Sequence, residues 1–254
     1  MNNNWMANYL NQVLLAGACI LLHFPFILNA QDAQVQKPGF RVSGSVDLTN
    51  NGVAPVPAFT LGDPALINSI SISKGKFTYT PEVALDFDGN PWFIENWMRY
   101  QLVDDKFGFY IGADWSFFFQ DYTPAQKEDS AVLETQRYLA LEVAGTYKFS
   151  SNISSTFKYW YNKGVGERTI DGHFVDFTLT ISQIPVSDHI SLEIEPEIFF
   201  LEFTGQQDGL FIANGIKISH KHFPVSFTSQ MIRHLWSNIP NLKTEWSVAV
   251  QYTY

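Results

Sequence analysis

The sequence predicts an all-β protein: an antiparallel, up-and-down transmembrane β-barrel of about twelve strands. Three observations favour this fold class. Apolar and polar residues alternate with a period of two from Phe40 to the end, the alternating runs are long, and aromatic residues gather near the ends of these runs. Such alternation is expected when one face of each strand lies in an apolar medium and the other face lies in water.

Residues 1–30 are expected to be a secretory signal peptide, and residues 31–254 the barrel domain. The apolar run VLLAGACILLHFPFIL extends from Val13 to Leu28, and a polar stretch begins at Gln31. A retained membrane anchor is one alternative, although the run is short for a bilayer helix. A lipoprotein signal ending at Cys19 is another, although an apolar stretch follows where a mature lipoprotein would turn polar.

Twelve alternating runs are expected to form the strands. In chain order they occupy residues 40–50, 66–73, 76–88, 91–104, 106–118, 132–147, 152–162, 173–184, 189–203, 210–220, 223–236 and 243–254. The last run shows the pattern most clearly, because one of its faces consists of Trp246, Val248, Val250, Tyr252 and Tyr254. The third, eighth and ninth runs alternate in the same way. Pro81 and Pro196 interrupt two runs, and we expect a local bulge at each.

The gaps between these runs also follow a pattern. The even-numbered connections are tight, and the odd-numbered ones are mostly longer, beginning with residues 51–65. An even number of strands with turns at one rim and loops at the other is typical of an up-and-down barrel. The runs are longer than the usual soluble strand of about 5 to 6 residues. Most of them fit the tilted bilayer strand of about 9 to 11 residues, and such a sheet must close because lipid satisfies no backbone polar group.

The terminal VAVQYTY, together with the segment LGDPALINSISISKGKFTYTPEVALDFDGNPWFIENWMRYQL, resembles bacterial outer-membrane β-barrel proteins. In particular, it is similar to an uncharacterised barrel family of Bacteroidota, and the resemblance covers about Phe40 to Tyr254. The resemblance implies cleavage before Gln31, a location in the cell outer membrane, and tight turns that face the periplasm. It also implies that the barrel-assembly machinery recognises Tyr252 and Tyr254. It implies no activity.

Composition argues against nucleic-acid binding and predicts an acidic lumen. The chain has 16 Lys and Arg against 25 Asp and Glu, a net charge of −9, and no basic run, so we expect no nucleic-acid partner. If the apolar parity faces lipid, the opposite parity carries eleven acids against four bases into the lumen. The residues that we expect to matter most there are Glu193, Glu195, Glu197, Lys217, Arg99, Glu95, Asp114 and Lys158.

Two interpretations of this lumen stay open. A wall rich in acids favours an aqueous passage for small solutes, with a preference for cations. Alternatively, Lys217, Lys158 and Arg99 form salt bridges to the acids and close a narrow bore. The bulky Trp97, Tyr110, Tyr138 and Trp160 share the inward parity and favour partial filling.

Motifs for chemistry are weak, so we expect no catalytic residue, metal or cofactor. His173 with Asp171 and Asp176 is one combination for a lipid hydrolase or protease at the outer rim, and His234 with Ser229 and Ser237 is another; neither has a known spacing. The enzyme is therefore the alternative to a non-catalytic passage or structural barrel. A barrel subunit of a secretion or uptake complex is a third hypothesis.

Overall fold

The computed structural model describes residues 39–56, 59–122, 132–205 and 207–254. Contacts divide the chain into two units, Met1–Lys37 and Pro38–Tyr254. The expected signal peptide, residues 1–30, lies outside the described residues. The second unit contains every strand discussed below.

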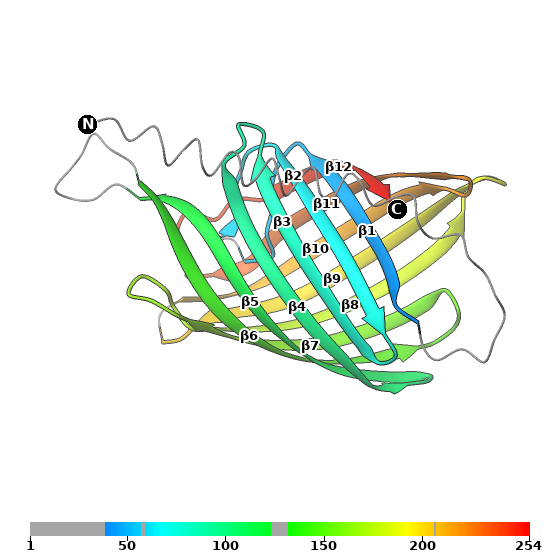
Figure 1. Cartoon of the computed structure of the whole chain (residues 1–254), viewed down its shortest axis with the longest axis horizontal. Coiled ribbons are helices and arrows are strands. Elements are labelled where there is room, and N and C mark those ends of the chain that lie inside the picture. Colours follow the sequence, from blue (N-terminus) through cyan, green and yellow to red (C-terminus); the bar gives the residue numbers. More distant parts are fainter. Residues whose placement is uncertain (1–38, 57–58, 123–131, 206) are drawn as a thin grey trace. The chain divides into compact units, whose positions relative to one another are not determined.

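Twelve antiparallel strands form one closed barrel, in which each strand pairs with its sequence neighbours and β12 pairs with β1 (Figure 1). The strands are β1 Arg41–Thr49, β2 Ala65–Lys74, β3 Phe77–Asp86, β4 Pro91–Asp104, β5 Phe107–Tyr122, β6 Val132–Lys148, β7 Ile153–Gly164, β8 Gly172–Pro185, β9 Ile190–Phe203, β10 Gln207–His220, β11 Phe223–Ser237 and β12 Glu245–Thr253. The predicted fold class is confirmed, and each expected run overlaps one strand. The main differences are that β5 continues to Tyr122 and that β10 begins at Gln207.

The two rims differ as the gaps predict. The connections after even-numbered strands span two to four residues, whereas those after β1, β5, β7 and β11 are longer. Gly75, in the tight β2–β3 turn, has a φ of +59°, which glycine adopts without a steric penalty. We call the end of the barrel with the connections after even-numbered strands the turn rim, and the opposite end the loop rim. The start of β1 and the end of β12 both lie at the turn rim (Figure 1).

Pro81 and Pro196 do not produce the expected bulges. In the β2–β3 ladder the register on both sides of Pro81 is the same, with Ser69 opposite Glu82 and Ile72 opposite Tyr79, and only the rungs between them are missing. The β8–β9 ladder likewise skips the rungs beside Pro196. Each proline still occupies a regular position in the ladder on its other side. Because proline has no N–H, the pairing with one neighbouring strand is interrupted beside it, but the register of the two strands does not change.

The outer face of the barrel is apolar. Large side chains on it are more than half exposed, among them Trp115, Leu141, Phe157, Phe227 and Trp246. Exposed apolar side chains on this scale are expected on a sheet whose outer face contacts lipid. Within the part of the chain that the structure describes, no helix has the length and hydropathy to cross a bilayer.

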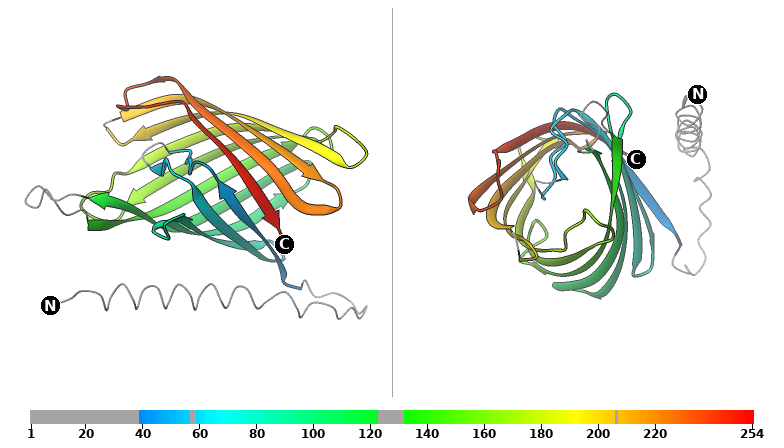
Figure 2. Two further views of the ribbon diagram at one scale, coloured as in Figure 1. Left: turned by 90° about the horizontal axis from the view of Figure 1, so that it is seen from above. Right: turned by 90° about the vertical axis from the view of Figure 1, so that its left-hand side faces the viewer.

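The connection between β1 and β2 lies inside the barrel. We call its described residues, 50–56 and 59–64, the inner segment; in Figure 2 it runs within the ring of strands. The ring of Phe59 stacks on Phe118 of β5 at 4.0 Å, and its carbonyl oxygen accepts a hydrogen bond of 2.8 Å from the indole N–H of Trp92. Val56 packs into the apolar cluster formed by Phe174, Phe199, Leu201, Phe211, Ala213 and Ile232.

A series of neighbouring aromatic rings, most of them stacked, lines the inner wall beneath this segment. The series runs from Trp97 of β4 to Trp160 of β7, Phe174 of β8, Phe199 of β9 and Phe211 of β10, with successive ring centroids 5.4, 4.8, 5.1 and 4.9 Å apart. Stacking adds to the area that each ring buries. The inward-facing residues are thus mostly polar toward the turn rim and mostly aromatic toward the loop rim.

Candidate functional site

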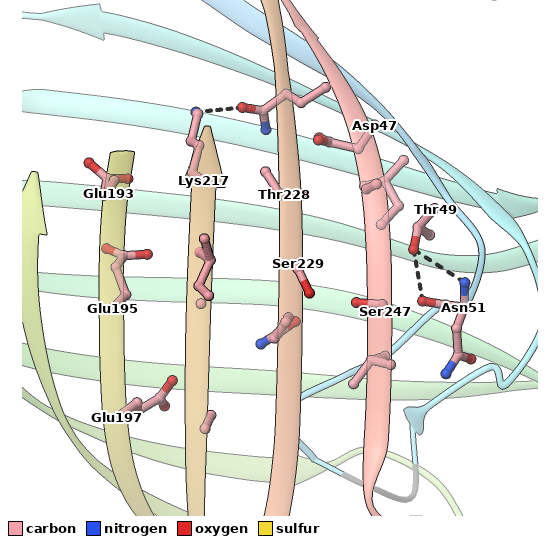
Figure 3. Close-up of a pocket in the computed structure, with 18 of the residues that line it drawn as sticks. Asp47, Thr49, Asn51, Glu193, Glu195, Glu197, Lys217, Thr228, Ser229 and Ser247 are labelled. Carbon is pink, nitrogen blue, oxygen red and sulfur yellow. Dashed lines mark hydrogen bonds between the residues drawn. The ribbon is translucent and has the colours of Figure 1, made fainter. Parts of the chain in front are cut away.

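A row of three glutamates stands on the inner wall of β9. Glu193, Glu195 and Glu197 are two residues apart, so the pleat places all three side chains on the same face. They line a cavity of about 550 Å³ that we call the polar cavity (Figure 3). Asp47 and Lys217 line it as well, together with Thr178 of β8, Thr228 and Gln230 of β11, and Ser247 and Gln251 of β12.

No described lysine or arginine forms an ion pair with a glutamate of this row. Lys217 is directly opposite Glu193 in the β9–β10 register, yet its ammonium group donates a hydrogen bond of 2.6 Å to the side-chain oxygen of Gln251 (Figure 3). Glu195 accepts a hydrogen bond of 3.1 Å from the hydroxyl of Thr180. None of the ion pairs formed by the described residues involves the row. The polar cavity therefore has a net negative wall, which attracts cations.

The other two inward bases form ion pairs with acids outside the row. Arg99 donates two hydrogen bonds to the carboxylate of Glu142, at 3.0 and 3.1 Å. The ammonium group of Lys158 lies 2.9 Å from Asp176. Two of the three bases thus form salt bridges to inward acids, as the second interpretation of the lumen expects, but their partners are Glu142 and Asp176 and not the row. The inner segment, and not these salt bridges, occupies the bore.

Glu95 and Asp114, also predicted in the lumen, line a different cavity. It measures about 220 Å³ and lies between the inner segment and the wall from β2 to β7; we call it the aromatic cavity. Glu82 is its third carboxylate. The sequence predicts these three acids on the inward parity, but not their separation from the row on β9, because alternation assigns a face and not a position around the barrel.

The first catalytic combination does not come together. Asp176 is inward and buried, whereas His173 has the opposite parity and receives or donates a hydrogen bond of 2.8 Å at the hydroxyl of Tyr159. Asp171, in the β7–β8 connection, is 2.6 Å from the ammonium group of Lys163. This hydrogen bond holds the pKa of the Asp171 carboxyl below its usual value. Asp171 therefore binds Lys163 at the loop rim and does not orient a catalytic histidine.

The second combination is also dispersed. His234 shares the inward parity of Ile232, and its Nδ1 atom is buried with no hydrogen-bond partner among the described residues. Ser229 has the opposite parity and accepts a hydrogen bond of 2.9 Å from the indole of Trp246. The hydroxyl of Ser237 donates to the carbonyl oxygen of Asp208 at 2.8 Å. Among the described residues no group of three His, Cys, Asp or Glu side chains is arranged to hold a metal ion.

Sequence reasoning missed the inner segment. Residues 51–65 read as a long loop at one rim, although the stretch is rich in apolar residues and carries one charge, on Asp63. That composition is unusual for a hydrated loop and is the signal that could have found it. Val53, Ala54, Val56, Phe59 and Leu61 pack against the inner wall.

Comparison with solved structures shows the same fold. The KdgM porin, solved in complex with disordered oligogalacturonate, aligns over 84% of this chain and 98% of its own at 12% identity, with a TM-score of 0.50. An outer membrane channel from Pseudomonas putida F1 aligns over 89% and 98% at 10% identity, also at 0.50. LpxR from Salmonella typhimurium aligns over 84% and 99% at 9% identity, again at 0.50.

Comparison by sequence gives no relative. No family model matches the chain, and no curated protein does. The likeness at 9 to 12% identity extends to the fold alone. The chain thus has the closed, all-antiparallel twelve-strand barrel fold of bacterial outer-membrane proteins.

Proposed function

We propose that this chain is a non-catalytic barrel of the cell outer membrane that passes small solutes, with a preference for cations, and that its inner segment holds the passage in a closed state. One observation carries the proposal: Glu193, Glu195 and Glu197 line the polar cavity without an ion pair among the described residues. A wall with unbalanced negative charge attracts cations and repels anions.

The charge of the interior also selects among solutes. The KdgM porin was solved with oligogalacturonate, which is an acidic oligosaccharide. An interior lined by Asp47 and the three glutamates repels such a polyanion. The similar fold therefore does not carry that solute over to this chain, and we propose the opposite sign of selectivity.

Conductance in planar lipid bilayers tests the proposal. We expect the purified chain to open in a cation-selective manner, and we expect the triple variant Glu193→Gln, Glu195→Gln, Glu197→Gln to lose most of that selectivity. Glu202→Gln is the matched control, because Glu202 is on the same strand but on the opposite parity and its replacement leaves the lumen charge unchanged. Permanent silence of the wild type, also under conditions that release the inner segment, would favour a purely structural barrel. Anion selectivity would contradict the proposal.

We also propose the location and the partners of the barrel. Its outer face contacts outer-membrane lipid, its tight turns lie in the periplasm, and the barrel-assembly machinery recognises Tyr252 and Tyr254. Both tyrosines are about half exposed, at 48% and 50%, and their rings stack at 6.3 Å, so they are accessible at the end of β12. Comparing assembly in cells with refolding in detergent tests this, as argued below. Membership of a Bacteroidota family stays a prediction from the sequence.

A further inference from the structure

The aromatic cavity combines two features that the proposed passage does not require. Its walls carry the rings of six residues from four strands of the barrel, in sequence order Trp92, Phe93, Trp97, Phe118, Tyr138 and Trp160. Trp92, Phe93, Trp97, Phe118 and Tyr138 are each less than a tenth exposed. An enclosed space with aromatic walls binds apolar or cationic groups through the faces of the rings.

Three carboxylates open into the same space. Glu82, Glu95 and Asp114 come from the consecutive strands β3, β4 and β5. Glu82 and Glu95 are directly opposite each other in the β3–β4 register, a placement in which like charges repel. No lysine or arginine is among the described residues that line the cavity.

The hydrogen bonds of these carboxylates come from neutral donors. The indole of Trp97 donates to Glu95 at 3.0 Å, and the backbone N–H of Asn96 donates to Asp114 at 2.6 Å. Arg99, on the same strand as Glu95, is already held by two hydrogen bonds to Glu142. Negative charge that is removed from water and not balanced by an ion pair is unfavourable, so these carboxylates favour a cation in the cavity.

We propose that the aromatic cavity is a binding site for a small organic cation of the methylated ammonium class. Aromatic faces stabilise such a cation by cation–π contacts, and the three carboxylates supply opposite charge. A hydrated metal ion fits less well, because magnesium and calcium require oxygen ligands on several sides and most of this wall is carbon. At about 220 Å³ the cavity is smaller than the about 300–1,000 Å³ typical of pockets for drug-sized ligands, which limits the ligand to a few heavy atoms.

The cation reaches this site from the polar cavity. Val53 and Ile67 line both cavities, so the two spaces adjoin at the inner segment. The glutamate row on β9 then concentrates cations at the entrance. The inference deepens the proposed function, since it names the class of cation, but binding and conduction are measured separately and fail separately.

Binding of tetramethylammonium to the purified full chain in detergent, followed by calorimetry and by tryptophan fluorescence, tests the site. We expect saturable binding of tetramethylammonium and of choline, and much weaker binding of 3,3-dimethyl-1-butanol, which has the shape of choline without its charge. Glu95→Gln and Trp97→Leu are each expected to weaken binding by about tenfold or more. Asp114 is left intact, because its carboxylate holds the backbone of Asn96.

Two control variants locate the effect. Glu202→Gln, on the outward parity of β9, is expected to bind like the wild type. Glu195→Gln removes an acid of the polar cavity and is expected to change affinity by less than Glu95→Gln does. The mobility shift of the folded barrel on unheated gels shows that each variant has folded.

Three results would overturn the inference. These are no saturable binding of either ammonium ion to the wild type, equal binding of the uncharged alcohol, and a loss of binding in Glu195→Gln with none in Glu95→Gln. Cation-selective conductance that persists without ammonium binding would overturn only this inference. Ammonium binding without conductance would leave it in place and contradict the proposed passage.

Discussion

Glu142 shows what a single inward residue contributes to this barrel. It is 2% exposed, it accepts two hydrogen bonds from Arg99, and it accepts a third of 2.7 Å from the indole of Trp160. Arg99 and Glu142 lie on β4 and β6 and meet across Gly112 of β5, where an added Cβ would be 3.2 Å from the Arg99 side chain. The missing side chain of Gly112 therefore makes room for the ion pair.

Alternation predicts that both partners face inward, but not that they meet. The sequence places Arg99, Glu142 and the other inward acids on the same face of the sheet. Which acid lies beside which base depends on the stagger between strands that are not neighbours, and period two carries no information about that stagger. For this reason the sequence leaves open which of the inward acids Arg99 and Lys158 pair with.

Replacing Glu142 by alanine is expected to destabilise the barrel by about 2–3 kcal/mol, because a guanidinium group that is mostly removed from water loses its counter-charge. The expected loss is below the upper range for buried pairs, since the Arg99 side chain is still 30% exposed. Reversible unfolding by urea in lipid or detergent measures it. Asp104→Asn breaks the exposed pair with Lys148 and is expected to cost at most about 1 kcal/mol. Equal losses in both variants would contradict the argument.

The strands are the part of the structure that the sequence predicts best. The strands are nine to seventeen residues long, period two covers most of each, and only a sheet with two different faces gives that pattern over such lengths. Ends are less well predicted, as in β5 and β10, because a strand continues past its last alternating residue wherever the neighbour still offers a partner. β5 and β6 pair in one unbroken register from Phe107 with Tyr147 to Tyr122 with Val132.

The seam between β1 and β12 closes the barrel and bears on the role of the last strand. Its ladder runs only from Ser45 with Thr253 to Thr49 with Ala249, and backbone hydrogen bonds of 2.9 Å in both directions between Gly44 and Tyr254 extend it. An added Cβ on Gly44 would be 2.5 Å from the ring of Tyr254. Tyr254 is thus both a packing residue of the seam and part of the predicted assembly signal.

Two substitutions separate these roles. Tyr252→Ser removes an exposed ring from the signal and is expected to lower the folded fraction in cells several-fold, while refolding in detergent stays close to wild type. Gly44→Ala keeps both tyrosines but displaces the Tyr254 ring, so we expect near-normal assembly in cells and a loss of about 1 kcal/mol in unfolding experiments. The folded fraction is read from gel mobility without heating. If Tyr252→Ser impairs both processes equally, the tyrosine acts through packing alone.

The whole barrel combines an acidic half with a half that is filled by aromatic residues and the inner segment. The sequence predicts the first half, because charge and parity together decide which acids face inward. For the second half it predicts inward aromatic residues such as Trp97, Tyr138 and Trp160 but not the inner segment, because the length of a connection does not say whether the chain lies outside the bore or folds into it. Apolar residues such as Val56 and Phe59 indicate that the connection folds into the bore only once the inward rings of β8, β9 and β10 are known to lie beneath them.

The inner segment is expected to control conductance. Phe59→Ala removes the stack on Phe118 and the edge contact of 5.2 Å with Tyr138, contacts worth about 0.5–1.5 kcal/mol beyond the buried area. A loss of that size, together with the lost burial, shifts the balance between closed and open states by about tenfold or more. Single-channel recording should therefore show a higher open probability with the same cation selectivity, since the β9 glutamates are unchanged. Phe87→Ala, at the same rim but 64% exposed, should record like the wild type. An unchanged open probability in Phe59→Ala would mean that the segment is a fixed part of the wall, and the passage would then have to open elsewhere.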